Sequence, residues 1–315
     1  MKRRRLLALT GATSGGLAFA AYAQRPAMSR VGFLSATDLE PSWTLFRKAM
    51  TALGYVDGKT VQYEVRAGDA AALPALANEL VGANVDVIVA HLTPAILAAQ
   101  RATSTIPIIF NGGAPETGIV RNVARPEGNL TGLYGGTSII SSKSIEIFRD
   151  INPMTRSIAL LLNAPDPFRV PLQRETEMAA RAQQIEFVPV MLNARTELAA
   201  AYESLVTRKI DGVIVQPSLG LLETATLALR HRLPAMSFRP EFARNGGLFA
   251  YSADPDELFR LLAAYVDKAL KGTPTASMPV QLATRFQLVV NQRTAKTLGL
   301  VLSPMFLTRA DEVIE

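Results

Sequence analysis

Apolar and polar residues alternate in two kinds of run along most of this chain. Short runs rich in Val, Ile and Leu, such as Val31–Ser35 and Val85–Ala90, are typical of buried strands. In the longer stretches between them apolar residues recur every three or four positions, as Phe46, Met50 and Leu53 do, which favours helices. Strands that alternate with helices build βαβ units, so the pattern predicts an α/β fold with mainly parallel sheets.

The units fall into two successive series, separated by the turn-rich segment Arg125–Asn129. In the first series we expect strands at Val31–Ser35, Val61–Val65, Val85–Ala90 and Ile108–Phe110 and helices at Leu73–Val81 and Ala95–Ala102. In the second series we expect helices at Ser142–Ile151, Arg169–Gln184, Glu197–Arg208 and Leu221–Arg230 and strands at Ile158–Leu162, Phe187–Met191, Val213–Val215 and Ala235–Phe238. Two α/β lobes leave a cleft between them, and open α/β sheets bind ligands beyond the carboxyl ends of their strands.

The composition agrees with a globular protein of two lobes. The chain has 315 residues, of which 49% are hydrophobic and 19% are charged, enough to bury full cores. The formal charge of +6 would suggest an acidic partner, but Lys2 and the run Arg3–Arg5 supply four of the positive charges. Without these four, 29 basic residues face 27 acidic ones, which leaves no electrostatic footprint for nucleic acid.

The N-terminal segment has the three parts of an export signal. A basic cluster is followed by the uncharged stretch Leu6–Ala21 and by Ala21-Tyr22-Ala23, an A-x-A cleavage site. We therefore expect residues 1–23 to be a signal peptide cleaved near Ala23, and the mature protein to reside in the periplasm. A membrane anchor is the alternative, but the stretch is rich in Gly, Ala, Ser and Thr and falls short of about 20 apolar residues. The Arg3–Leu7 run leaves Sec and twin-arginine export both open.

Several motifs, taken in order, closely resemble the tryptophan/tyrosine-type family of ABC-transporter substrate-binding proteins. They include Leu53–Lys59, Val85–Val89, Ala124–Gly132, Gly246–Leu248 and Arg309–Glu315, and together the resembling stretches span nearly all of the chain after the N-terminal signal. The resemblance implies a periplasmic-binding-protein type I fold, in which two Rossmann-like lobes with parallel sheets are joined by three hinge crossovers.

The resemblance also implies where the chain passes between the lobes. The crossovers are expected near Asn129–Tyr134, Leu248–Ser252 and Gln281–Leu288. The first lobe should then comprise residues 30–131 plus 250–282, and the second lobe residues 132–249 plus 283–315. The implied function is to capture a small organic ligand in the interlobe cleft, as a monomer, and to present it to an ABC permease in the inner membrane.

Polar residues that follow the expected strands are the candidate ligand-binding residues. In the first lobe they are Ser35, Thr93, Pro94, Asn111 and Gly112. In the second lobe they are Asn163, Asp166, Gln216, Ser218, Arg239 and Glu241. Thr93 and Pro94 fit the cap and first position of a helix whose N-terminus could hold a carboxylate. The alternatives are that Thr93 is only a cap and that the others are solvated loop residues.

One departure from the family bears on the ligand. Many relatives carry Asp-Pro where this chain has Ala114-Pro115. The family implies an amino acid or a related aromatic compound, whose carboxylate Thr93 or Arg239 could receive. An ammonium group would need Asp38, Asp166 or Glu241. Because the acid is replaced at Ala114, the sequence favours an aromatic or aliphatic carboxylate, with amino acids as the close alternative.

Signatures of catalysis are sparse. The chain has no P-loop, no G-x-S-x-G motif and no cysteine, and its two histidines, His91 and His231, cannot form a His-rich metal site. We expect a binding protein with no catalytic residue, no metal and no cofactor. Two alternatives remain: an exported α/β enzyme that acts on a small molecule, and a ligand-sensing partner of a signalling receptor.

Overall fold

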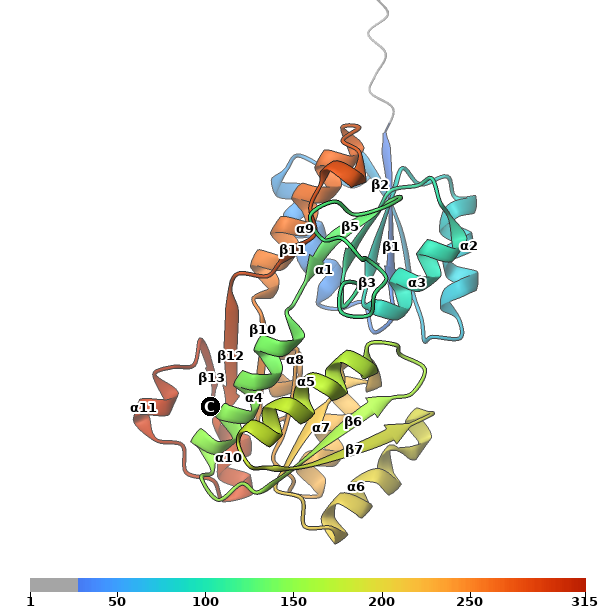
Figure 1. The fold of residues 1–315 in the computed structure, drawn as a ribbon. Coiled ribbons are helices and arrows are strands. Elements are labelled where there is room, and N and C mark those ends of the chain that lie inside the picture. Colours follow the sequence, from blue (N-terminus) through green and yellow to red (C-terminus); the bar gives the residue numbers. More distant parts are fainter. Residues whose placement is uncertain (1–27) are drawn as a thin grey trace, which may run out of the picture.

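The computed structural model describes residues 28–315; the predicted signal peptide and its cleavage site near Ala23 lie outside the described residues. Two sheets form the centres of two lobes, one above the other in Figure 1. The strand order is β11-β5-β4-β3-β1-β2 in the first sheet and β13-β12-β10-β9-β8-β6-β7 in the second. All pairs are parallel except β10 with β12, so the predicted α/β fold with two mainly parallel sheets is confirmed.

The first sheet is covered by helices on both faces. Its strands are β1 (Ser29–Ser35), β2 (Val61–Ala67), β3 (Val87–His91), β4 (Ile108–Asn111), β5 (Leu130–Tyr134) and β11 (Gln281–Leu282). Its helices are α1 (Ser42–Ala52), α2 (Leu73–Gly82), α3 (Thr93–Ala102) and α9 (Pro255–Leu270). Residues that alternate along a strand enter different cores: Val87 packs with α1 and α9, and Ile88 packs with α2 and α3.

The second sheet has the same layered arrangement. Its strands are β6 (Ser157–Asn163), β7 (Glu186–Leu192), β8 (Gly212–Val215), β9 (Ala235–Ser237), β10 (Phe249–Ala253), β12 (Phe286–Asn291) and β13 (Glu312–Ile314). Helices α4 (Thr137–Ile151) and α5 (Arg169–Ala182) cover one face, and α6 (Leu198–Thr207) and α7 (Leu221–Arg230) cover the other (Figure 1). The short helices α8 (Pro240–Arg244), α10 (Gln292–Leu298) and α11 (Pro304–Leu307) complete this lobe.

The chain crosses between the sheets three times, and two crossings differ from the expected lobe limits. Strand β5 pairs with β4 as far as Leu133 and with β11 at Leu133 and Tyr134, so the segment 132–134 belongs to the first sheet and not the second. Residues 250–253 belong to the second sheet and not the first, because β10 pairs with β9 and β12 there. We take residues 29–134 with 255–282 as the first lobe and 137–253 with 286–314 as the second lobe.

Most expected elements lie within a few residues of the observed ones, and α4 is the main exception. It begins at Thr137, whereas the sequence pattern predicted a start at Ser142. Its first turns bury small polar residues: the hydroxyls of Ser141 and Thr176 are hydrogen-bonded to each other, and Ser144 Oγ donates to the carbonyl of Ile140. These residues interrupt the apolar periodicity although they face the core.

Within residues 28–315, the structure contains no helix with both the length and the apolar character needed to cross a bilayer.

Candidate functional site

A cavity of about 140 Å³ lies between the two lobes at the carboxyl ends of their parallel strands. The first lobe contributes residues after β3 and β4 and from the start of α1, and the second lobe contributes the loops after β6, β8 and β9. Strand β10 and helix α9, which flank a crossing, complete the wall. This is the position at which open α/β sheets place their ligands.

Most of the predicted candidates line this cavity. They are Thr93, Asn111, Gly112, Asp166, Gln216, Ser218, Arg239 and Glu241. The three others, Ser35, Pro94 and Asn163, do not line this cavity. Ser35 Oγ is engaged within its own loop, where it donates to the carbonyl of Thr37. Pro94 is buried in α3, and Asn163 Nδ2 donates to Ser218 Oγ.

Thr93 lines the cavity but does not cap α3. The cap residue is Leu92, with φ of 70°, and no side chain accepts a hydrogen bond from the first turn. Pro94 lies in the first turn, as expected. Because a Leu rarely adopts positive φ, the turn between β3 and α3 is held by its surroundings at the cavity edge. The Thr93 side chain is therefore not occupied by the capping role that the sequence predicted.

A chain of polar contacts leads from β4 to α1 on the first-lobe side. Asn111 Nδ2 lies 3.3 Å from His91 Nδ1, and His91 Nε2 lies 3.3 Å from Ser42 Oγ. Since the amide nitrogen of Asn111 can only donate, His91 Nδ1 accepts and His91 Nε2 donates to Ser42. Burial, with a smaller effect of the Arg239 charge, lowers the pKa of His91 to about 3. The imidazole is therefore neutral at physiological pH.

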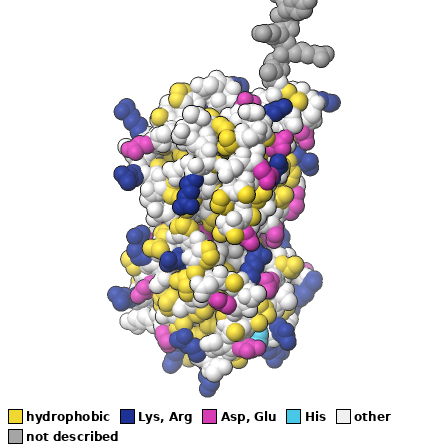
Figure 2. All heavy atoms as spheres, turned by 90° about the vertical axis from the view of Figure 1, so that its right-hand side faces the viewer, with side chains coloured by type: hydrophobic (Ala, Val, Ile, Leu, Met, Phe, Trp, Pro, Cys, Tyr) yellow, Lys and Arg dark blue, Asp and Glu magenta, His cyan; other side chains and the backbone are white. Residues whose placement is uncertain are grey.

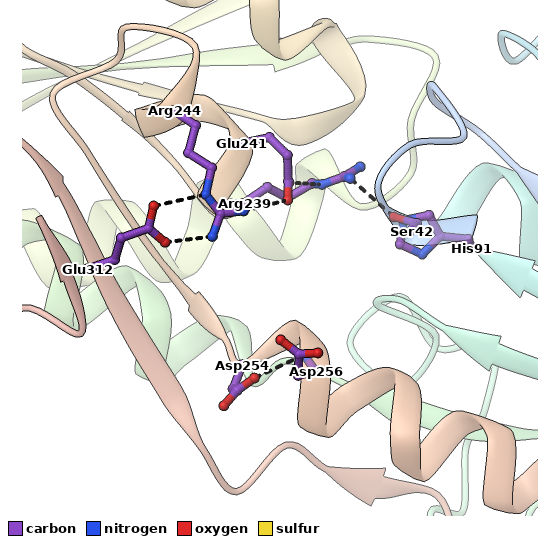
Figure 3. A network of polar contacts seen from close by, with 8 residues as sticks. All are labelled: Ser42, His91, Arg239, Glu241, Arg244, Asp254, Asp256 and Glu312. Carbon is purple, nitrogen blue, oxygen red and sulfur yellow. Dashed lines mark hydrogen bonds and ion pairs between the residues drawn. The ribbon is translucent and has the colours of Figure 1, made fainter. Parts of the chain in front are cut away.

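Arg239 brings a positive charge to the cavity and links the two lobes (Figure 3). Its Nη2 donates to Ser42 Oγ of the first lobe at 3.1 Å, and its Nε donates to Glu241 Oε2 at 3.0 Å. Behind this pair, Arg244 forms an ion pair of 2.6 Å with Glu312. The guanidinium group is thus fixed between the lobes by groups on both sides, which orients it for an anionic ligand group.

Asp166 is buried in the second-lobe wall with both carboxylate oxygens engaged. Oδ1 accepts from the backbone N–H of Phe168 at 2.9 Å. Oδ2 accepts from Gln216 Nε2 and from Ser218 Oγ, each at 2.8 Å. Burial raises the pKa of Asp166, and the three hydrogen bonds act in the opposite direction. The carboxylate organises the loops after β6 and β8.

Glu116 and Ser252 are cavity residues that the sequence interpretation missed. Glu116 Oε1 accepts from the N–H and the hydroxyl of Thr137, at 3.3 and 3.0 Å. Glu116 Oε2 and Ser252 Oγ are buried and have no partner among the described residues. Burial raises the pKa of Glu116. The sequence did contain one indication of Glu116, because it immediately follows Ala114-Pro115, where many relatives carry an acid.

The rest of the wall is mainly apolar. It includes the side chains of Leu45, Ile140, Phe168, Phe238, Leu258 and Phe259. A cavity of about 150 Å³ with such a lining binds benzene in another protein, so this space suits one aromatic ring. In residues 28–315 no group of three or more His, Cys, Asp and Glu side chains is placed to hold a metal ion. On the face seen in Figure 2, charges of both signs are interspersed, without the one-sign patch of a nucleic-acid interface.

Comparison with known proteins agrees with this arrangement. A model of the family described as ABC transporter substrate binding protein matches residues 33–314. A tyrosine-binding protein of Clostridioides difficile (strain R20291) is 25% identical over 264 residues, which cover 81% of this chain and 75% of that protein. Two solved structures each cover 91% of this chain and 99% of their own. They are a conserved domain protein from Vibrio cholerae (23% identity, TM-score 0.83) and an ABC domain from Streptococcus pneumonia in complex with L-Trp (20% identity, TM-score 0.82).

Proposed function

Because the chain belongs to the ABC transporter substrate-binding protein family, we propose that it is the periplasmic receptor of an ABC importer and binds an aromatic amino acid between its lobes. The family and the named relatives are binding proteins rather than enzymes. The role here is therefore capture and presentation of a ligand without turnover. Import and periplasmic location rest on the family and on the export signal expected in residues 1–23.

The proposed ligand class rests on one observation: a cavity large enough for one aromatic ring combines charged groups with apolar walls. Arg239, which is hydrogen-bonded to Ser42, and Thr93, which lines the same cavity, offer donors to a carboxylate. Glu116 offers a buried carboxylate oxygen to an ammonium group. Phe168, Phe238 and the other apolar side chains of the wall suit an aromatic ring.

The sequence favoured a simple carboxylate over an amino acid because Ala114 replaces an acid. Glu116 favours an amino acid again, because this acidic residue lines the cavity two positions after Ala114. The relatives point the same way, because one is named for binding tyrosine and another was solved with L-Trp. We therefore place aromatic amino acids ahead of their deaminated analogues.

A thermal-shift screen tests this assignment. A ligand that binds only the native state raises the melting temperature by mass action. L-Tyrosine, L-tryptophan and L-phenylalanine should raise it more than the matching deaminated acids, sugars or aliphatic amino acids. Stabilisation by sugars alone, or by deaminated acids in preference to amino acids, would contradict the proposed ligand class.

Export is tested separately. Protein recovered from the periplasm should have the intact mass of a chain that begins near Gln24, because cleavage is expected after Ala23. Recovery only as the full-length chain in the cytoplasm would remove the periplasmic importer from the proposal.

A further inference from the structure

The cavity contains three acidic side chains, and they differ in how far their oxygens are already engaged. Asp166 accepts three hydrogen bonds over its two oxygens. Glu241 Oε2 is paired with Arg239, and Glu241 Oε1 lies 3.8 Å from Arg244. Both oxygens of Asp166 already accept hydrogen bonds, and the charge of Glu241 is already paired with two arginines, although the sequence offered both residues as ammonium partners. The third sequence candidate, Asp38, does not line this cavity.

Glu116 differs from these two because one of its oxygens is unengaged. Oε1 is held by Thr137, while Oε2 is buried without a hydrogen-bond partner. No Lys or Arg in the described part of the chain forms an ion pair with it. A buried carboxylate without a counter-ion is unfavourable, and the raised pKa of Glu116 reflects that burial. A cationic group in the cavity would supply the missing charge.

A second unengaged oxygen lines the same cavity. Ser252, on β10, is 5% exposed, and its Oγ has no partner. An ammonium group has three N–H donors, so it needs more than one acceptor when it is buried. Glu116 Oε2 and Ser252 Oγ are acceptors of this kind, one charged and one neutral. The orphaned atoms therefore match the chemistry of a primary ammonium group.

The position of Glu116 also couples this recognition to the contact between lobes. Glu116 follows β4 in the first lobe, whereas Thr137 is the first residue of α4 in the second lobe. Ser252 lies on β10, which runs up to the crossing into α9. The two hydrogen bonds from Thr137 to Glu116 therefore join the two lobes in this structure. They hold the carboxylate in place with its other oxygen free.

We propose that Glu116 is the specificity-determining residue of this site: it recognises the ammonium group of the ligand together with Ser252, and Thr137 positions it when the lobes close. This inference rests on the proposed function, because it assigns the cationic end of the ligand in that same cavity. Arg239 then receives the carboxylate, and the ligand orientation is fixed by two opposite charges.

Calorimetric titration of the wild type and Glu116→Gln with L-phenylalanine and 3-phenylpropanoate tests the proposal. The amide keeps the shape of the side chain and removes its charge. The affinity of Glu116→Gln for L-phenylalanine should fall about 10- to 100-fold, as for loss of a hydrogen bond to a charged group. Its affinity for 3-phenylpropanoate, which has no ammonium group, should be unchanged or higher. The matched control is Glu175→Gln, which removes a carboxylate close to Glu116 that does not line the cavity, and should change either affinity less than about threefold.

Thr137 provides the second arm, since its role is to position Glu116. Thr137→Val should lower the ratio of the affinity for L-phenylalanine to the affinity for 3-phenylpropanoate. It should also reduce the compaction that L-phenylalanine causes, measured by small-angle scattering. Thr137→Ser keeps the hydroxyl and should leave both quantities close to those of the wild type. If Glu116→Gln weakens both ligands equally, or neither, the assignment of Glu116 is wrong while the proposed function stands. If the wild type binds 3-phenylpropanoate but not L-phenylalanine, L-tyrosine or L-tryptophan, the proposed function fails and the assignment fails with it.

Discussion

The ring of Phe168 lies directly against the backbone of Gly113 across the cleft. A Cβ atom at Gly113 would approach Phe168 Cδ2 to 2.2 Å, closer than any real contact of this kind. Gly113 follows β4 in the first lobe and Phe168 precedes α5 in the second, so this contact joins the two lobes. The absence of a side chain at Gly113 is therefore a condition for this closed arrangement.

Gly113→Ala should weaken ligand binding at least tenfold with little change in the melting temperature of the unliganded protein. The added methyl group collides with the other lobe and leaves the packing within the first lobe alone. Calorimetry and thermal melts measure the two effects. Adding Phe168→Ala should restore part of the affinity, because it removes the colliding ring.

Gly112→Ala is the matched control for that substitution. A Cβ there would lie 3.0 Å from Ile96 and 3.2 Å from the backbone of Leu92, both in the first lobe. It should therefore lower the free energy of unfolding, by about 1–3 kcal/mol as for overpacking. If Gly113→Ala instead lowers the melting temperature as much as Gly112→Ala does, the contact with Phe168 is structural and not a feature of closure.

Arg239→Gln should lower the affinity for aromatic amino acids about 10- to 100-fold, because it removes the charge-assisted hydrogen bonds to the carboxylate. Calorimetry with L-phenylalanine checks this expectation. Arg244→Gln is the control, since Arg244 pairs with Glu241 and Glu312 but does not line the cavity. Equal losses in the two variants would indicate that Arg239 supports the fold of the loop and does not contact the ligand.

His91 should remain neutral from pH 8 to pH 5, because burial and Arg239 lower its pKa to about 3. Its imidazole proton shifts, assigned by comparison with a His231→Asn variant, should show no inflection near the ordinary value of 6.5. The lowered pKa of His91 also determines how this residue changes the stability of the fold with pH. The unfolded chain takes up a proton on His91 below about 6.5, so this residue makes the fold less stable as the pH falls towards 3. An inflection between pH 6 and 7 would contradict the buried placement.

Affinity for an aromatic amino acid should decrease as the pH falls through the raised pKa of Glu116. The protonated carboxyl cannot pair with an ammonium group, and burial makes protonation begin at a higher pH than the ordinary 4.5. The Glu116→Gln variant should lack this part of the pH profile. Asp166, whose pKa is also raised, remains in the variant, so the difference between the two profiles isolates Glu116. Superimposable profiles would contradict the assignment.

The strands were predictable because their apolar runs are continuous, and the position of the cleft followed from where those runs end. Asn111, Gln216 and Arg239 were found in this way, since each lies at the end of a buried strand or just after it. Asp166 was also found, but two of its three hydrogen bonds come from Gln216 and Ser218, which are distant in the sequence, so the full engagement of its carboxylate could not be predicted.

Residues whose role depends on a contact with the other lobe could not be predicted from the pattern of apolar and polar residues. Ser42 looks like an ordinary polar residue at the start of a helix, and only Arg239 from the other lobe shows its role. Glu116 is surrounded in sequence by turn residues and has no periodicity. Its importance arises from Thr137 on the opposite lobe, which no local sequence signal reports.

Calorimetric titration of the purified protein with L-tyrosine, L-tryptophan and L-phenylalanine tests the central claim most directly. We expect binding of one ligand per chain for at least one of the three, with the affinity reduced at least tenfold by Arg239→Gln. Absence of heat with all three amino acids, or binding that Arg239→Gln leaves unchanged, would contradict capture of an aromatic amino acid in the cavity between the lobes.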